Sequence, residues 1–313
     1  MVAAAVIPRV PDPRSFRPMP LPRRLPGHSL RLASAVLVLA AVAACVPRTS
    51  DLLTSGACLA PDEVTDADGD FRRHPELFGP ERCVRQTSFR EGGRTWTVQT
   101  VRNTARAGPL WVLPHDNEQA AVDTAVYALA RYGGTAVLVE TGGRRDNGAT
   151  DPNRAFDAGR SRCTAGAPAS RYVAAMLGSR SRGAPVIALH TNAPGIAGRR
   201  GSGSISIRTP GKAGTAFPGT GATGRLASSD SLVITAIAQG PALDARTAAL
   251  VAKLTGEGVN VLMERTSPST TDCSLSHYAA LNGIRPYLNI EVVDGDSATQ
   301  RQILDIAMAA LGK

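Results

Sequence analysis

Hydrophobic and polar positions alternate along most of the chain with two periods, which predicts strands separated by helices. Short apolar runs ending in a polar residue predict buried strands, and longer segments with apolar residues three or four positions apart predict helices. The predicted strands are 135–140, 184–190, 232–238, 259–264 and 287–293, after an apolar run that begins at Trp111. The predicted helices are 119–132, 171–179, 244–255, one that stops near Gly283, and 297–313. This order predicts an α/β fold: a mixed, largely parallel sheet flanked by helices, in a single domain.

Three stretches depart from this alternation. Residues 86–101 alternate around Gly92 and Gly93, which predicts a β-hairpin at the start of the main domain. Residues 195–229 are rich in Gly, Ser and Thr and have little periodicity, so we expect a lid or a disordered insertion. Residues 46–65 have the polar and proline-rich character of a linker. We therefore divide the chain into an extension over 45–85 and the main domain over 86–313.

The first 44 residues have the features of a secretory signal. A segment rich in Pro and Arg precedes the apolar run LRLASAVLVLAAVAAC, which ends in small residues before Cys45. The run is too short and too rich in Ala at its end for a transmembrane helix. Because Val42–Cys45 also resembles a bacterial lipobox, we expect cleavage before Cys45 and a lipid on its sulfur. An ordinary signal with an incidental cysteine is the alternative. The lipid would anchor the protein to a membrane in the cell envelope, facing the periplasm or the exterior.

Removing the signal lowers the net charge. Residues 1–44 hold six Arg and one Asp, so the formal charge falls from +9 to +9 − 5 = +4. The remaining chain has no run of basic residues interleaved with aromatic ones, which argues against a nucleic-acid partner. With 43% hydrophobic and 4% aromatic residues, the composition is that of a globular protein.

Four cysteines remain after Cys45, namely Cys58, Cys83, Cys163 and Cys273. An even number in an oxidising compartment favours two disulfides over a metal cluster. Cys58 with Cys83 is the economical local pair, which leaves Cys163 for Cys273. Four cysteines allow three pairings, and the sequence alone leaves all three open.

The segment WVLPHDNE suggests a metal site. His115 and Glu118 follow an apolar run and a proline, and both side chains are zinc ligands. A catalytic zinc needs a third protein ligand, and His190 ends another predicted strand. In α/β sheets ligands bind beyond the carboxyl ends of the strands, where both histidines would lie. Glu291 is a further candidate, because a carboxylate within an apolar strand is costly to bury without a partner.

Four segments occur in the order found in the carboxypeptidase A-like zinc carboxypeptidases. They are WVLPHDNE, DPNRAFDAG, IALH and YLNIEVVD, and the resemblance covers about residues 108–313. It implies that His115, Glu118 and His190 bind Zn²⁺. It also implies that Asn153 and Arg154 bind the substrate carboxylate and that Glu291 is the general base.

Two more residues are similar to those of bacterial members of the family. Arg145 precedes the DPNR segment as an arginine does in the murein peptide amidase branch, which implies a role in stabilising the developing oxyanion. Tyr278, in SLSHYAALNGIRPYLNIE, corresponds to a phenol in the substrate site. Asp116 departs from the pattern, because a small residue usually follows the first His.

The spacing of the motifs points to a compact member. Glu118 to Arg154 and Arg154 to His190 are each 36 residues (154 − 118 and 190 − 154), shorter than in digestive carboxypeptidases. Such intervals resemble the compact bacterial branch and the related succinylglutamate desuccinylase/aspartoacylase group. We expect a zinc-dependent metallopeptidase or amidase that hydrolyses an amide next to a free carboxylate, in peptidoglycan stem peptides or similar fragments. The alternatives are an N-acyl amino acid deacylase of the aspartoacylase kind and a non-catalytic envelope lipoprotein.

Overall fold

The computed structural model describes residues 56–156, 170–193, 205–211, 213–240 and 242–313. These residues belong to one compact unit that spans 47–313. The predicted signal over 1–44, the predicted lipidation site Cys45 and Cys163 lie outside the described residues. Within the described residues, no helix combines the length and the hydrophobicity needed to cross a membrane.

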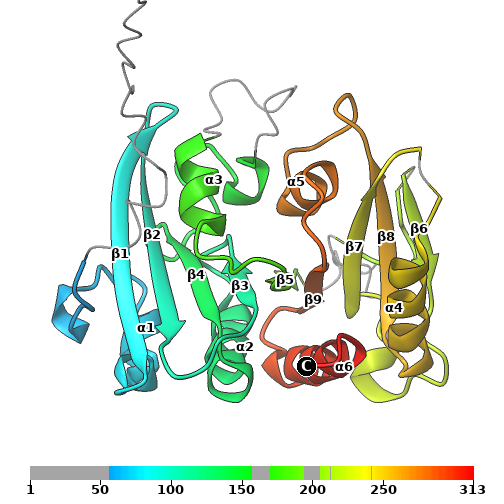
Figure 1. Ribbon diagram of the computed structural model, residues 1–313, viewed down its shortest axis with the longest axis horizontal. Helices are drawn as coiled ribbons and strands as arrows, with labels where there is room; N and C mark the ends of the chain where they lie inside the picture. Colours follow the sequence, from blue (N-terminus) through cyan, green and yellow to red (C-terminus); the bar gives the residue numbers. More distant parts are fainter. Residues whose placement is uncertain (1–55, 157–169, 194–204, 212, 241) are drawn as a thin grey trace, which may run out of the picture. The chain divides into compact units, whose positions relative to one another are not determined.

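The described residues form a nine-stranded mixed sheet whose centre is parallel (Figure 1). The strands are β1 (Arg82–Glu91), β2 (Arg94–Asn103), β3 (Leu110–Leu113), β4 (Thr135–Glu140), β5 (Val186–Asn192), β6 (Gly214–Phe217), β7 (Leu232–Ala238), β8 (Asn260–Thr266) and β9 (Tyr287–Val293). Their order is β1-β2-β4-β3-β5-β9-β7-β8-β6. Strands β4, β3, β5 and β9 run parallel, and the β1–β2 hairpin and β6 add antiparallel edges. The predicted α/β fold with a mixed sheet is confirmed.

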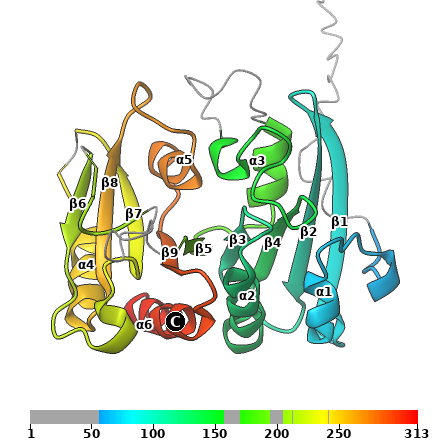
Figure 2. The ribbon, with the colours of Figure 1, turned by 180° about the vertical axis from the view of Figure 1, so that it is seen from behind.

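Helices cover both faces of this sheet. They are α1 (Asp70–Arg73), α2 (Gln119–Tyr132), α3 (Ser170–Leu177), α4 (Ala245–Gly256), α5 (Leu275–Leu281) and α6 (Ser297–Ala310), with short 3-10 turns such as η4 (Pro152–Arg154). Figure 1 shows α3 and α5 on one side of the central strands and α2 and α6 on the other. Figure 2 gives the same arrangement from behind, with β1 and β6 at the two edges.

Alternation along the strands separates two hydrophobic cores. On β3, Trp111 and Leu113 belong to the core under α2, α4 and α6, whereas Leu110 and Val112 belong to the core under α3 and α5. Successive side chains of a strand point to opposite faces, so a strand covered on both sides is apolar throughout. This explains why the central strands are uninterrupted apolar runs in the sequence.

The turn between α2 and β4 requires glycine. Gly133 and Gly134 have φ values of +73° and +89°, which L-residues with a side chain rarely adopt. A Cβ atom on Gly134 would lie 2.1 Å from the carbonyl oxygen of Pro109. These glycines therefore end the helix where the sequence predicts and let the loop before β3 pass close by.

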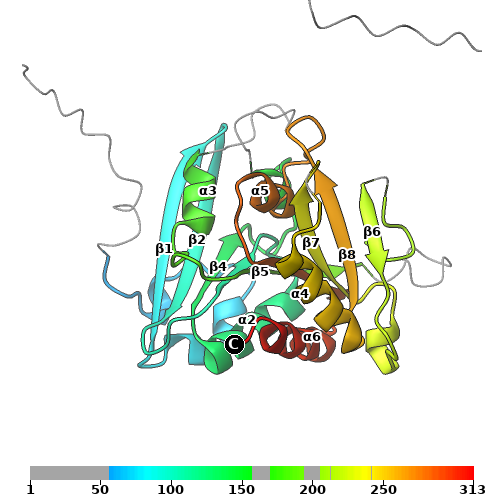
Figure 3. The same cartoon turned by 45° about the vertical axis from the view of Figure 1, so that its right-hand side comes forward.

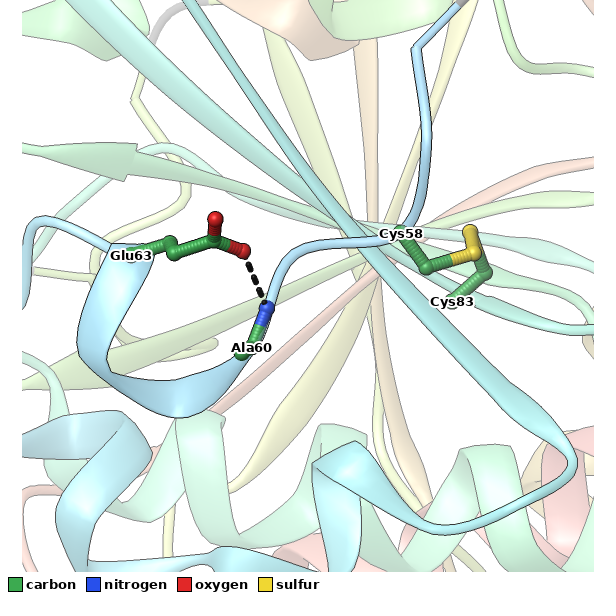
Figure 4. The surroundings of a disulfide bond; sticks show 4 residues. All are labelled: Cys58, Ala60, Glu63 and Cys83. Atoms are coloured by element: carbon green, nitrogen blue, oxygen red, sulfur yellow. Dashed lines mark hydrogen bonds between the residues drawn. A yellow bond between two sulfur atoms is a disulfide. The ribbon is translucent and has the colours of Figure 1, made fainter.

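The segment before the hairpin packs against the main domain. Strand β1 begins at Arg82, four residues before the predicted start of the domain, and Phe71 and Leu77 are buried in the core under α2. A disulfide joins Cys58 to Cys83 on β1 (Figure 4), the local pair favoured by the sequence. Cys273 is also disulfide-bonded. Its predicted partner, Cys163, lies outside the described residues.

Part of the segment expected to form a lid or an insertion is instead an edge strand. Residues 194–204 and 212 lie outside the described residues, but β6 pairs with β8 in antiparallel register. Its four residues are too few and too mixed in character to form a period-two pattern, so no strand is predicted here from the sequence.

Candidate metal centre

Three side chains converge beyond strands β3 and β5. His115 lies two residues after β3, Glu118 immediately precedes α2, and His190 lies within β5. Each is only 2% exposed. Because β3 and β5 are parallel neighbours, their carboxyl ends bring the two histidines to the same edge of the sheet. The three residues that the sequence singles out as metal ligands are therefore adjacent.

The donor atoms of this group lie close enough to share one ion. His115 Nδ1 is 2.7 Å from Glu118 Oε1 and 3.1 Å from His190 Nδ1, and His190 Nδ1 is 3.2 Å from Glu118 Oε2. Ligands about 2.0–2.1 Å from a tetrahedral zinc are about 3.3 Å apart, which is close to these separations. Two imidazole nitrogens that face each other at this distance are better suited to binding a shared cation than to a direct contact between the two rings. The donor set therefore fits a divalent metal such as Zn²⁺.

Asp151 orients the first of these histidines. Its Oδ1 is 2.8 Å from His115 Nε2, the ring nitrogen that faces away from His190. A carboxylate on the outer nitrogen of a histidine ligand fixes the tautomer and the ring orientation. Burial opposes ionisation of Asp151, but hydrogen bonding to His115 and the nearby arginines outweigh it and lower the pKa to about 2. Asp151 is thus an anion held against His115.

Glu118 is the electrostatic centre of the group. Burial opposes its charge, but His190 and hydrogen bonding to both histidines hold the pKa of Glu118 well below its usual range. The amide N–H of Thr191 donates to Oε2 over 3.1 Å, and Arg145 Nη1 donates to Oε1 over 3.0 Å. Glu118 therefore stays ionised, as a metal ligand must be.

Arg145 reaches the group from the loop after β4. Its side chain is 48% exposed, and it also lies 3.8 Å from Asp151. The loop is held by Asp116, whose Oδ2 accepts from the amides of Thr141 and Gly143 over 2.6 and 2.8 Å. The unusual residue after His115 thus anchors the segment that brings Arg145 to Glu118.

Glu291 lies beside His190 because their strands are paired. Strands β5 and β9 are parallel, and His190 is directly opposite Glu291 in their register. Glu291 is 4% exposed, and Asn289 donates to its Oε1 over 3.0 Å. Burial raises the pKa of Glu291, although the nearby His190 partly opposes this. A carboxylate shifted toward neutrality is suited to taking and giving back a proton.

The predicted carboxylate-binding pair lies next to Asp151, on η4. Asn153 Oδ1 accepts from the amide of Leu275 at the start of α5, over 3.0 Å. Its amide nitrogen Nδ2 has no hydrogen-bond partner among the described residues. Arg154 pairs with Asp272 at 3.4 Å, with both side chains about 40% exposed. Asn153 and Arg154 are therefore neighbours on η4, and the arginine is paired with a carboxylate of the protein.

Tyr278 lies in a different environment from the other predicted site residues. It is on α5, its ring is 6.2 Å from that of Phe156, and it packs against the core under α3 and α5. No described contact joins Tyr278 to the metal ligands or to Arg154.

Asp151 and Asp272 were not predicted from the sequence as site residues. Asp151 stands inside the quoted segment DPNRAFDAG, and its Asp-Pro pair marks the start of a helical turn. That signal predicts its capping of η4 but not its bond to His115. Asp272 has no pattern of its own, because it meets Arg154 only through the fold.

A second group of acidic side chains lies nearby. Oxygen atoms of Asp68, Asp70 and Asp116 are within 4.8 Å of one another. The sequence around them briefly resembles a calcium loop, although Leu77 stands where an EF-hand has its bidentate Glu. Burial, and then the Asp68 carboxylate, raise the pKa of Asp70 to about 7. The carboxyl group of Asp70 therefore ionises less readily than a solvent-exposed one.

Comparison with known proteins finds similarity among solved structures. No protein-family model and no curated protein matches this sequence. The chain is similar to a metallo-carboxypeptidase from Burkholderia cenocepacia, with a TM-score of 0.43, 15% identity, and 77% and 67% of the two chains covered. For an aspartoacylase family protein from Mesorhizobium loti, the values are 0.37, 13%, and 75% and 68%. These are the two groups that the motifs resemble.

Proposed function

We propose that this protein is a metal-dependent hydrolase that cleaves an amide bond next to a free carboxylate. The observation that carries the proposal is the convergence of His115 Nδ1, His190 Nδ1 and the Glu118 carboxylate within 2.7–3.2 Å of one another. Glu291 lies opposite His190 in the register of β5 and β9, so it is next to the three proposed ligands. Two imidazoles and one carboxylate leave a fourth position for water or substrate, as in catalytic zinc sites.

The residues divide the chemistry between them. Zn²⁺ held by the three ligands would supply a Lewis acid that polarises a carbonyl and acidifies water. Glu291, buried and with a raised pKa, takes a proton from the attacking water and passes it to the leaving amine. Arg145 supplies positive charge where the carbonyl oxygen becomes negative. Arg154 and the amide nitrogen of Asn153 bind the substrate carboxylate through charge-assisted hydrogen bonds.

The N-terminal sequence supports a location for the protein, and that location suggests a class of substrate. The predicted signal over 1–44 and the lipobox at Cys45 support an anchored position in the cell envelope. Peptidoglycan stem peptides carry amide bonds next to free carboxylates in that compartment. We therefore propose such peptides as substrates.

Metal analysis and a substrate comparison test the proposal. The protein purified and loaded with Zn²⁺ is incubated with muropeptides and, separately, with N-acyl amino acids, and the products are read by mass spectrometry. We expect muropeptide cleavage, with both metal and activity lost in His115→Ala. We expect Glu291→Gln, the matched variant, to keep the metal and lose activity by at least about 100-fold.

Two other results of these assays would lead to different conclusions. Cleavage of N-acyl amino acids alone would replace the peptidase with a deacylase of the aspartoacylase kind. If the protein takes up no stoichiometric metal and His115→Ala equals the wild type in every assay, the catalytic proposal is wrong and a binding lipoprotein replaces it.

A further inference from the structure

A cavity lies at the end of the sheet opposite the candidate metal centre. Its volume is about 560 Å³, and it lies against the start of β1, the end of β2 and the starts of β3 and β4. Arg82 at the start of β1 pairs with Asn103 at the end of β2, and Arg102 pairs with Thr135 at the start of β4. The metal centre lies beyond the carboxyl ends of β3 and β5. The two sites are therefore separated by the length of the central strands.

The strand register explains why this part of the sheet face is open. Cys83 pairs with Arg102 and Arg85 pairs with Thr100, so these four side chains share one face of the hairpin. Further along the same face, Trp96 and Val98 are buried under α3. Figure 3 shows that α3 lies beside the part of β1 and β2 that is near the hairpin turn. The helix ends at Leu177, and the rest of the face is left to the cavity.

Many of the residues that line this space are polar or cationic. The described residues that line the cavity include three arginines and five Ser or Thr residues, and no Asp or Glu. They are Arg85, Arg102, Arg106, Thr100, Thr104, Thr135, Ser179 and Ser181. Cys58 and Cys83, which are joined by a disulfide, also line the cavity.

Two of the arginines have no carboxylate partner in the described part of the chain. Arg102 is exposed and takes part in no described ion pair. Arg106 is exposed as well, and its Nη1 donates to the carbonyl oxygen of Arg131 rather than to an acid. The charges of Arg102 and Arg106 are therefore not balanced by a carboxylate of the described residues, and an anion bound in the cavity would balance them.

We propose that this cavity binds a phosphate-bearing ligand. The arginines that line it come from three segments, namely β1, β2 and the loop before β3. A phosphate group offers tetrahedrally arranged oxygens to several donors, whereas a carboxylate offers two oxygens in one plane. A volume of about 560 Å³ is that of a small-molecule site, larger than a bare ion needs. The site is independent of the metal centre and shares no residue with it.

Calorimetric titration at low ionic strength tests this assignment. The probes are inorganic phosphate and glycerol 3-phosphate, with glycerol as the uncharged control. Vesicles of phosphatidylglycerol, compared with vesicles of phosphatidylcholine, present the same chemistry as a lipid headgroup. We expect binding of the phosphate probes, weakened at least tenfold by Arg102→Glu and at least threefold by Arg106→Gln. Added salt weakens binding because part of the interaction is between exposed charges.

The matched control is Arg90→Glu. Arg90 is exposed and lies on β1, but alternation places it on the other face of the strand from Arg85. We expect it to bind the probes as the wild type does. Circular dichroism and zinc content, unchanged in all three variants, show that they fold.

These titrations distinguish a soluble phosphate ester from a lipid headgroup, and they also test whether the cavity binds phosphate at all. Binding of glycerol 3-phosphate assigns the site to soluble phosphate esters, and binding only of anionic vesicles assigns it to a membrane headgroup. The proposal is overturned if the wild type binds none of the phosphate probes above the controls. It is also overturned if Arg102→Glu binds as tightly as the wild type.

Discussion

His115 contacts a carboxylate through each of its ring nitrogens. Nδ1 faces Glu118, and Nε2 faces Asp151 at 2.8 Å. Glu118 belongs to the candidate metal site, whereas Asp151 sets the direction of the ring. At the scale of single residues, the candidate site therefore depends on a side chain outside the proposed ligands.

Asp151→Asn is expected to weaken metal binding. The amide cannot match the carboxylate as an acceptor for His115 Nε2, so the imidazole becomes less basic and less well oriented. Loss of such a partner typically costs about 10- to 100-fold in metal affinity. Competition with a chelator of known affinity measures the change. An affinity equal to that of the wild type would show that Asp151 serves only η4.

Asp272→Asn is expected to tighten substrate binding. It removes the charge that pairs with Arg154 at 3.4 Å and leaves the guanidinium to the substrate carboxylate. Because both groups are partly exposed, the pair is worth up to about 1 kcal/mol, and KM should fall by up to about fivefold with kcat nearly unchanged. Asp294→Asn, at an exposed position outside this pair, is the control. A raised KM would show that Asp272 instead holds Arg154 in its binding position.

Asp70 is expected to make stability fall as pH rises. Burial and Asp68 raise its pKa to about 7 in the folded protein, compared with about 3.9 in an unfolded chain. The folded state thus binds more protons between about pH 4 and pH 7, and its stability decreases across this window. Asp70→Asn, which does not titrate, should be more stable than the wild type at pH 8 by about 1 kcal/mol.

Urea unfolding at pH 4 and pH 8 measures this effect. The exposed Asp62→Asn is the control and should follow the wild type. Equal pH dependence in Asp70→Asn and the wild type would contradict the assignment.

Elements in this protein are placed by contacts that join distant parts of the chain. The disulfide between Cys58 and Cys83 ties the segment before α1 to β1 across a separation of 25 residues. Closing a loop of this length removes unfolded-state entropy worth about 2–4 kcal/mol. The loop that the disulfide closes contributes Phe71 and Leu77 to the core, so the bond stabilises part of the hydrophobic interior.

The double variant Cys58→Ser/Cys83→Ser should lower the free energy of unfolding by about 2–4 kcal/mol. Denaturant unfolding under non-reducing conditions measures the loss. Wild type treated with a reductant should resemble the variant. If removing the bond changes nothing, the segment is held by its apolar contacts alone.

At the scale of the whole molecule, a metal ion would connect three elements. His115 follows β3, Glu118 immediately precedes α2 and His190 lies in β5, so one ion bound to all three would favour the folded state. We expect removal of zinc by a chelator to lower Tm by several degrees, because a ligand at 100 times its Kd adds about 2.7 kcal/mol. His115→Ala should show no such shift. An equal shift in both proteins would place the metal elsewhere.

The sequence predicted most elements because the central strands are covered on both faces. Strands β4, β7 and β9 and helix α2 match their predicted bounds, since an apolar run between two helical layers leaves a strong pattern. Strand β6 was missed because it is a short edge strand with mixed burial. The length of the β1–β2 hairpin was underestimated because its ends pair by backbone hydrogen bonds, which side-chain patterns do not record.

The sequence by itself determined the residue types of the candidate metal centre and their placement at strand ends. The sequence contains a His, a Glu and a second His after apolar runs. Because parallel strands align their carboxyl ends, residues at these positions are expected to lie close together. Only the tertiary structure decided that Asp151 holds His115, that Asp272 shares Arg154 and that three arginines surround one cavity. These contacts join positions up to 118 residues apart (272 − 154), and no local period encodes them. Their energies depend on burial and distance, which exist only after the chain has folded.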